Sequence, residues 1–212
     1  AFAALGDVVR AEVEQVAFRH ARTADLLKDE GMLSKRRLHN IPEQRKLDVA
    51  ELLLSGEILY RKGAFEEAFE TLRRGVISDD TLPFDEPWGW MVPVRHALAA
   101  LLSERAKEIE SEEERKEEAG SLWREAAQVY RKDLMLHPKN VWALVGLRDC
   151  LRGMGDEGSE EWARVTSMLE ECSRKTGVRL PTASCACAVS KWRVYKEEGT
   201  GSCCSSSSNT HH

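Results

Sequence analysis

The stretch that decides the fold is residues 56–72, which read GEILYRKGAFEEAFETL. Gly56 is followed seven positions later by Gly63, which is followed five positions later by Ala68 and nine positions later by Leu72. Apolar residues recur on both sides of Gly63 at three- and four-residue steps, the period of a helix with one apolar face. Small residues at Gly56 and Ala68 let two antiparallel helices approach closely, and Gly63 frees the backbone to turn. The stretch therefore predicts a helical hairpin.

Later parts of the chain repeat this spacing. The matching steps are Ala99 to Ala106 (seven), Ala126 to Tyr130 (four), and Ala126 to Pro138 (twelve, the step that also separates Ala68 from Asp80). A third unit opens at Trp142 and turns at Gly155. Helical hairpins repeated in this way are typical of the tetratricopeptide repeat (TPR). Because one hairpin cannot bury its apolar face alone, we expect about three stacked units.

The predicted fold class is therefore all-α, with TPR-like helical hairpins stacked as a short right-handed superhelix. Residues 7–30 place Val9, Val13 and Val16 at three- and four-residue steps, which predicts an N-terminal helix with one apolar face. The expected organisation is a helical segment over 1–44, which could end a preceding repeat, about three hairpins over 45–178 with a charged insertion at 107–118, a C-x-C segment over 179–198, and a flexible Ser/Cys-rich tail over 199–212.

Several short motifs give a closer resemblance. They are Leu38-His39-Asn40, Glu51, Gly56-Glu57-Ile58, Tyr60-Arg61-Lys62-Gly63, the block LPFDEPWGWM at 82–91, Arg95-His96-Ala97, Asn140-Val141-Trp142 and Ser184-Cys185-Ala186-Cys187. Over roughly residues 16–187 the chain resembles a subfamily of TPR domain proteins best known from bacteria. Two tryptophans around a glycine would not arise from helix periodicity, so the 82–91 block is specific. The resemblance implies a repeat fold and little about activity.

The chain departs from that subfamily in two places. Members usually carry a histidine-rich stretch in the third unit, where this chain has Val145, Leu147 and Arg148. Members also tend to end near the C-x-C, whereas this chain continues for 25 residues beyond Cys187. A ligand set that needs those histidines is therefore not expected here.

Composition narrows the classes of partner. The 212 residues include 31 basic and 36 acidic side chains, with a formal net charge of -5 and no basic stripe, so nucleic acid is not an expected partner. No apolar run approaches the roughly 18–20 residues of a membrane span, and no membrane partner is expected. The six cysteines form no disulfide framework and no export signal is present, so we expect reduced thiols and a cytoplasmic protein.

The first helix of each hairpin would line a concave groove. Its candidate residues are Glu57, Tyr60, Arg61, His96, Trp142, Asp149 and Arg152. Aromatic anchors with paired charges suit an extended peptide or a helix, so we predict a scaffold that binds a protein or peptide partner. The alternative is that these residues are the solvated side of amphipathic helices.

The tryptophan loop, residues 81–91, is the second candidate. Its functional candidates are Asp85, Glu86, Trp88 and Trp90. The two tryptophans either cover the interface between repeats or meet a partner, and packing is favoured because exposed tryptophan pairs promote aggregation. Asp85 and Glu86 could pair with Arg95, or join His96 in a polar pocket under the loop.

An enzyme is the competing hypothesis. A metal- or thiol-dependent site under the loop would draw its ligands from His39, His96, Cys185 and Cys187, because imidazole and thiolate are common ligands. None of these residues has a motif spacing, and no G-x-S-x-G or phosphate-binding glycine loop occurs. We therefore predict no enzymatic activity, no metal and no cofactor.

Overall fold

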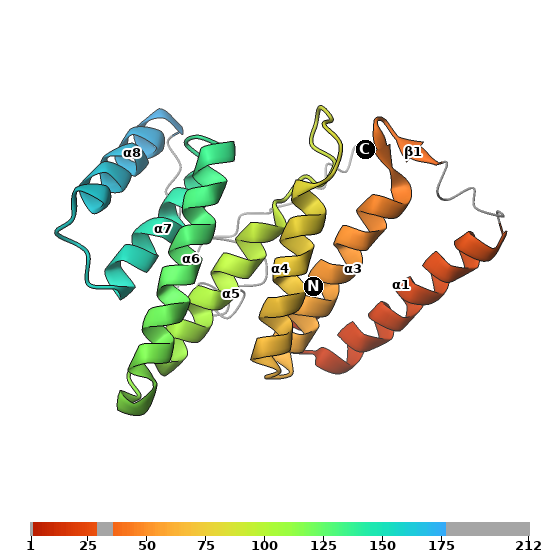
Figure 1. Ribbon diagram of the computed structural model, residues 1–212, viewed down its shortest axis with the longest axis horizontal. Helices are drawn as coiled ribbons and strands as arrows, with labels where there is room; N and C mark the ends of the chain where they lie inside the picture. Colours follow the sequence, from red (N-terminus) through yellow and green to blue (C-terminus); the bar gives the residue numbers. More distant parts are fainter. Residues whose placement is uncertain (1, 29–35, 177–212) are drawn as a thin grey trace, which may run out of the picture.

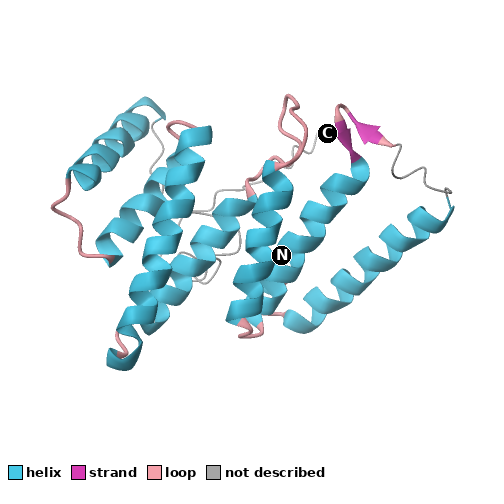
Figure 2. Cartoon of the chain, viewed as in Figure 1, coloured by secondary structure: helices cyan, strands magenta, loops and turns pink. Residues whose placement is uncertain are grey.

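The computed structural model describes residues 2–28 and 36–176 and confirms an all-helical chain (Figure 1). Only a two-residue strand pair interrupts the helices and loops of these residues (Figure 2). The elements are η1 (Ala3–Leu5), α1 (Val8–Lys28), β1 (Arg37–Leu38), β2 (Ile41–Pro42), α3 (Glu43–Arg61), α4 (Phe65–Asp80), α5 (Val94–Ile109), η2 (Glu113–Arg115), α6 (Lys116–Leu136), α7 (Val141–Gly153) and α8 (Glu160–Thr176). The C-x-C segment and the Ser/Cys-rich tail lie outside the described residues.

From α3 onward the helices follow one another as antiparallel hairpins, α3/α4, α5/α6 and α7/α8 (Figure 1). Two of the turns depend on glycine in the left-handed backbone region, Gly63 at φ 82° and Gly155 at φ 78°. At the first turn the Ala64 amide donates to the Leu59 carbonyl at 3.0 Å, which satisfies a carbonyl at the helix end. The turn glycines predicted from the sequence are confirmed.

Close approach of the helices depends on glycines that lie under large side chains. A Cβ atom on Gly56 would lie 2.5 Å from Leu72 Cγ, within the α3/α4 hairpin. Between α6 and α7, a Cβ on Gly146 would lie 2.2 Å from the Tyr130 ring. The sequence predicted the role of Gly56, and Gly146 is a further position of the same kind.

Helix α5 lies at the centre of the core. Ten of its residues from Val94 to Ala106 are buried, among them Arg95 and His96. One apolar cluster extends continuously from Tyr60 on α3 to Leu169 on α8. The helix that opens the second hairpin is therefore enclosed by its neighbours.

The apolar face of α1 points away from α3. Val9, Val13 and Val16 are 72%, 63% and 50% exposed, whereas Ala11 and Gln15 are buried. The sequence pattern correctly indicated an apolar face on this helix, but these three valines stay largely exposed beside the other described elements.

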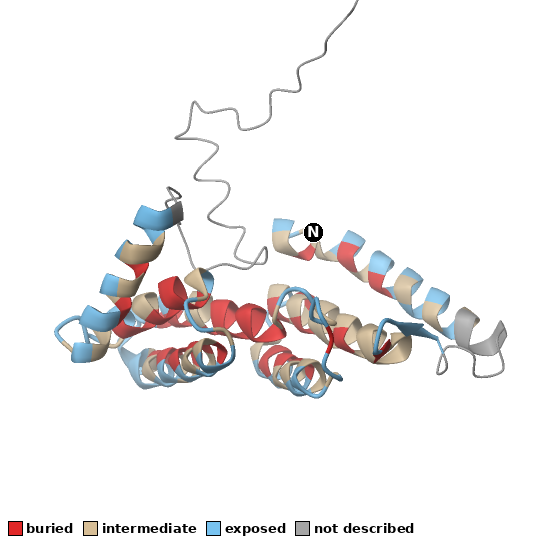
Figure 3. Ribbon diagram, turned by 90° about the horizontal axis from the view of Figure 1, so that it is seen from above, coloured by how far each residue is buried: buried red, intermediate tan, exposed pale blue. Residues whose placement is uncertain are grey.

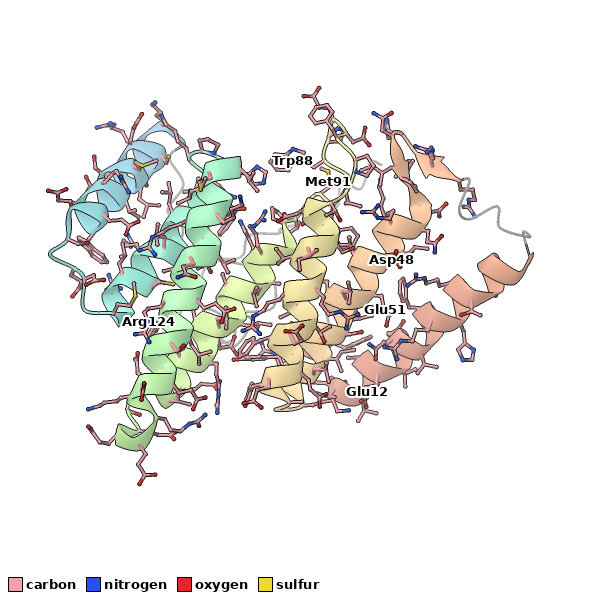
Figure 4. The ribbon with its side chains drawn as sticks, viewed as in Figure 1. Glu12, Asp48, Glu51, Trp88, Met91 and Arg124 are labelled. Carbon is pink, nitrogen blue, oxygen red and sulfur yellow. The ribbon has the colours of Figure 1, made fainter. Side chains whose placement is uncertain are left out.

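A small apolar cluster, in which Ala11 of α1 packs with Ile58 and Leu54 of α3, and several polar contacts hold α1 to α3. The Arg19 guanidinium pairs with the Glu51 carboxylate at 2.6 Å, and Arg22 pairs with Asp48. The Gln15 amide donates to the Ser55 hydroxyl at 2.8 Å. Figure 4 shows Asp48 and Glu51 on the side of α3 that faces α1. These contacts decide which face of α1 is turned inward.

Arginine–glutamate pairs link each hairpin to the next. The pairs are Arg61–Glu104 between α3 and α5 (2.6 Å), Arg73–Glu125 between α4 and α6 (2.7 and 2.8 Å), and Arg131–Glu161 between α6 and α8 (2.9 and 2.7 Å). Since these side chains are partly solvated, each pair contributes at most about 1 kcal/mol. Their two-point geometry constrains the register between hairpins.

The charged insertion expected at 107–118 is mostly helical. Helix α5 continues to Ile109 and α6 begins at Lys116, so only a short turn and η2 separate them. Ile109 is fully buried, which the charged composition of this stretch did not indicate.

The two end helices, α1 and α8, lean to the same side of the row formed by the other helices (Figure 3). None of the helices in the described residues combines the length and apolar composition of a bilayer crossing.

We predict that Gly146→Ala lowers the free energy of unfolding by about 1–3 kcal/mol, because the added methyl group collides with the buried Tyr130 ring. Gly120→Ala is the matched control within α6. Its nearest neighbour is the flexible end of Arg124, so helix propensity should raise stability by about 0.5–1 kcal/mol. Urea denaturation of both variants measures these changes. Equal stability of Gly146→Ala and the unmodified protein would contradict the close-approach interpretation.

Candidate functional site

The tryptophan loop joins α4 to α5 near the middle of the helical row, at the upper ends of the helices in Figure 1. It packs on the β1–β2 hairpin: a Cβ atom on Gly89 would lie 1.9 Å from Cδ1 of the fully buried Ile41. The Arg45 guanidinium donates to the Thr81 carbonyl at 2.9 Å, and the Asn40 amide lies 3.5 Å from the Phe84 carbonyl oxygen. Contacts from α3 and the hairpin before it therefore hold the loop in place.

A cavity of about 480 Å³ lies between this loop, α5 and the end of α6. Its charged and imidazole side chains are Asp79, Asp80, Asp85, Arg95, Lys132 and His137, and its large apolar side chains are Leu82, Phe84, Trp88, Trp90 and Leu136. We call it the loop pocket. Its size and its mixture of aromatic and charged groups are typical of a ligand site.

The acidic end of α4 meets the first turn of α5 in the wall of the loop pocket. One guanidinium nitrogen of Arg95, a residue 3% exposed, lies 2.6 and 2.5 Å from the two carboxylate oxygens of Asp80. The expectation that Arg95 pairs with Asp85 or Glu86 is therefore wrong. Asp80 is the last residue of α4 and lies nearer, whereas Glu86 is exposed.

Asp79 lies beside this pair and accepts a hydrogen bond from the Val94 amide at 3.1 Å, at the N-terminus of α5. Burial raises the pKa of Asp79 from 3.8 to about 6, and the charge of Asp80 adds to this rise. The Val94 hydrogen bond and the charge of Arg95 oppose the shift without cancelling it. Asp79 is thus a carboxyl group whose charge is incompletely compensated within the protein.

Behind the loop pocket lies a buried polar cluster. The fully buried Asp133 carboxylate lies 3.1 Å from His96 Nε2 and accepts a hydrogen bond from the Asn140 amide at 2.9 Å. His96 is 4% exposed, so the prediction that it faces an open groove is wrong. Its place on α5, a helix enclosed by its neighbours, explains the difference.

His137 connects this cluster to the loop pocket. Its Nε2 lies 4.0 Å from Asp133 Oδ1, and its ring centroid lies 4.0 Å from that of Trp88. Burial lowers the pKa of His137, although the charge of Asp133 opposes the shift. Trp88 reaches from the loop toward the end of α6 (Figure 4) and remains 50% exposed. Trp88 therefore packs on His137, as the packing alternative expects, while half of its surface stays accessible.

The remaining groove candidates do not form one surface. Tyr60 is 3% exposed and packs against Phe65, with ring centroids 5.2 Å apart, so the expectation that Tyr60 lines a groove is wrong. Arg61 is engaged by Glu104, and burial raises the pKa of Glu57. Tyr60 thus packs within the first hairpin, and Arg61 links that hairpin to the second.

On α7 the groove candidates are more open. Trp142 is 42% exposed, Arg152 pairs with Glu157 at 3.1 Å, and Asp149 lies 3.9 Å from the Lys107 ammonium. Trp142 is therefore the one groove candidate with a large aromatic surface still available.

The metal and thiol candidates are not brought together. His39 lies in the exposed β1–β2 turn at φ 55°, whereas His96 is enclosed by Asp133 and Asn140. Cys185 and Cys187 lie outside the described residues. Across residues 2–28 and 36–176, no three histidine, cysteine or acidic side chains are grouped as metal ligands.

Four polar residues of the loop pocket were not predicted from the sequence: Asp79, Asp80, Lys132 and His137. In the sequence, Asp80 stands out only as the residue at the end of one repeat step. No sequence pattern around Lys132 marks it as a site residue. His137 precedes the helix-ending Pro138, and a sequence does not show that this ring lies against Trp88.

Comparison with protein-family models, curated proteins and solved structures finds no match. The loop pocket is therefore interpreted from its own geometry.

We predict that Asp79→Asn changes the pH dependence of stability. Because the pKa of Asp79 is about 6 in the folded protein and 3.8 is its ordinary value, the folded state binds more protons between these values, and stability falls as the pH rises from about 4 to about 6. Asparagine keeps the acceptor for the Val94 amide without the charge, so the variant should gain stability relative to the unmodified protein over this range. Urea denaturation at several pH values measures it; parallel profiles would contradict it.

Proposed function

We propose that the protein is a TPR-like helical-repeat scaffold that binds a segment of another protein in the loop pocket. Three features support a stacked-repeat fold. They are three consecutive hairpins, glycines where helices approach closely, and arginine–glutamate pairs between hairpins. We further propose, from the cysteine pattern and the lack of a recognisable catalytic motif in the sequence, a cytoplasmic protein that is not an enzyme and uses no cofactor.

The single observation that carries the binding proposal is a mixed pocket surrounded by exposed apolar side chains. Phe84 is 77% exposed, Met91 67%, Trp88 50% and Leu136 48%, and all lie on the tryptophan loop or at the end of α6. Large apolar groups clustered around a recessed polar pocket are typical of the central anchors of protein interfaces. A peptide side chain would enter the loop pocket while the backbone crosses this rim.

The concave groove predicted from the sequence is a weaker candidate for the binding site than the loop pocket. Tyr60 and His96 are buried, whereas Trp142 keeps accessible surface on α7. Trp142 therefore serves as the comparison residue: binding in the groove would depend on Trp142, and binding in the loop pocket would depend on Trp88.

A displayed library of random peptides selected against the protein tests this proposal. We predict that enriched peptides lose about tenfold or more in affinity for Trp88→Ala and bind Trp142→Ala with nearly unchanged affinity, because truncating a central aromatic anchor commonly costs 2 kcal/mol or more. Thermal melts confirm that both variants are folded. Absence of enriched peptides, or peptides that depend on Trp142 and not on Trp88, would refute loop-pocket binding.

A further inference from the structure

We infer that the loop pocket binds a cationic side chain, an arginine guanidinium or a lysine ammonium group, between the indole rings of the tryptophan loop and the carboxylates of Asp79 and Asp85. This inference deepens the proposed function and rests on it for the statement that the cation belongs to a peptide.

Asp85 carries the first part of the argument. The residue is 6% exposed and its carboxylate lines the pocket. One carboxylate oxygen accepts from the Glu86 amide at 3.2 Å and lies 3.5 Å from the Asn40 amide nitrogen. In the described part of the chain it forms no ion pair with a basic side chain. Its other oxygen has no partner among the described residues and is not enclosed, so it can accept from a cation that enters the pocket.

Asp79 carries the second part. It accepts one hydrogen bond, from the Val94 amide, and also forms no ion pair within the described residues. Its neighbour Arg95 is held by Asp80 at 2.5 and 2.6 Å. Because Asp80 holds the Arg95 guanidinium, the charge of Arg95 compensates Asp79 only in part, and Asp79 and Asp85 have no ion-pair partner among the described residues.

The opposing charge in the pocket is weaker. Lys132 is exposed on α6, and its flexible ammonium can extend into water. Burial lowers the pKa of His137, which favours the neutral imidazole at pH 7. His137 therefore adds no positive charge beside Trp88. The pocket is therefore more acidic than basic, which favours a cation over an anion.

The aromatic groups suit the same ligand. The indole rings of Trp88 and Trp90 line the pocket, and indole faces attract guanidinium and ammonium groups more strongly than other side-chain rings do. The chain already uses such contacts elsewhere: the Arg105 guanidinium lies 4.0 Å from the Phe65 ring centroid. Aromatic faces combined with one buried and one half-buried carboxylate match an organic cation in both shape and charge.

Capped amino acids test the chemistry without any protein partner. Nα-acetyl-arginine amide and Nα-acetyl-lysine amide are titrated into 15N-labelled protein, and the indole N–H signals of Trp88 and Trp90, assigned with Trp→Phe variants, report binding. Nα-acetyl-citrulline amide, which has nearly the shape of arginine but no charge, is the matched neutral probe. We predict saturable shifts with one or both cations and none with citrulline at equal concentration. The two cationic arms show which group is preferred.

Charge-removing variants give effects of opposite sign. Asp85→Asn and Asp79→Asn should each lower the association constant for the cation about fivefold, since each removes one partly buried charge interaction. Lys132→Gln should raise it. Glu113→Gln, whose side chain is 83% exposed in η2 beside the α5–α6 turn at the far end of the helices, is the control and should leave it unchanged (Figure 1). Two separate aspartate variants keep the test open if one fails to fold.

Three outcomes of the titrations would overturn the inference: binding of citrulline as tight as that of arginine, tighter binding of Nα-acetyl-glutamate amide that is lost in Lys132→Gln, or no shift with either cation. Library peptides that depend on Trp88 but lack arginine and lysine would overturn it too, while leaving the proposed function in place. Binding of the capped cation together with a failed library selection would instead refute the peptide function and support the pocket chemistry.

Discussion

The contact between a glycine and a large side chain on the neighbouring helix is the constraint on which the rest of the structure depends. Leu72 over Gly56 sets the spacing within the first hairpin, and Tyr130 over Gly146 sets the spacing between α6 and α7. Because a Cβ atom at either position would overlap these side chains, the helices could not approach as closely there with any residue but glycine. The positions of the helix ends, and hence of every group in the loop pocket, follow from that spacing.

The loop pocket is formed where this packing stops. Helices α4 and α5 pack against each other through buried apolar residues. This packing also brings the acidic residues at the end of α4 against the first turn of α5. The tryptophan loop then covers them, and Gly89 lets it lie directly on Ile41. Because packing holds both the helix ends and the tryptophan loop in place, the loop pocket is preorganised, which reduces the entropy lost on binding.

Much of the fold could be predicted from spacing, and much of the site could not. Periodicity reveals hairpins and turn glycines such as Gly63 because both are local properties. It could not orient α1, since the choice between its valine face and its polar face depends on Glu51, a residue far along the chain. It placed His96 on an open surface for the same reason: Asp133, which holds that ring, belongs to another helix. The block containing Trp88 marked the correct loop because its composition is independent of helix period.

Asn140 shows how tightly one residue choice can be restricted. Its side-chain oxygen accepts from the Trp142 amide at 3.2 Å and begins α7, while its amide nitrogen donates to Asp133 at 2.9 Å. At most helix starts serine, threonine, aspartate and asparagine substitute for one another with little loss. Here aspartate would place a second carboxylate beside Asp133, and a hydroxyl would supply one atom for two separate tasks. Of the four interchangeable cap residues, this position admits one.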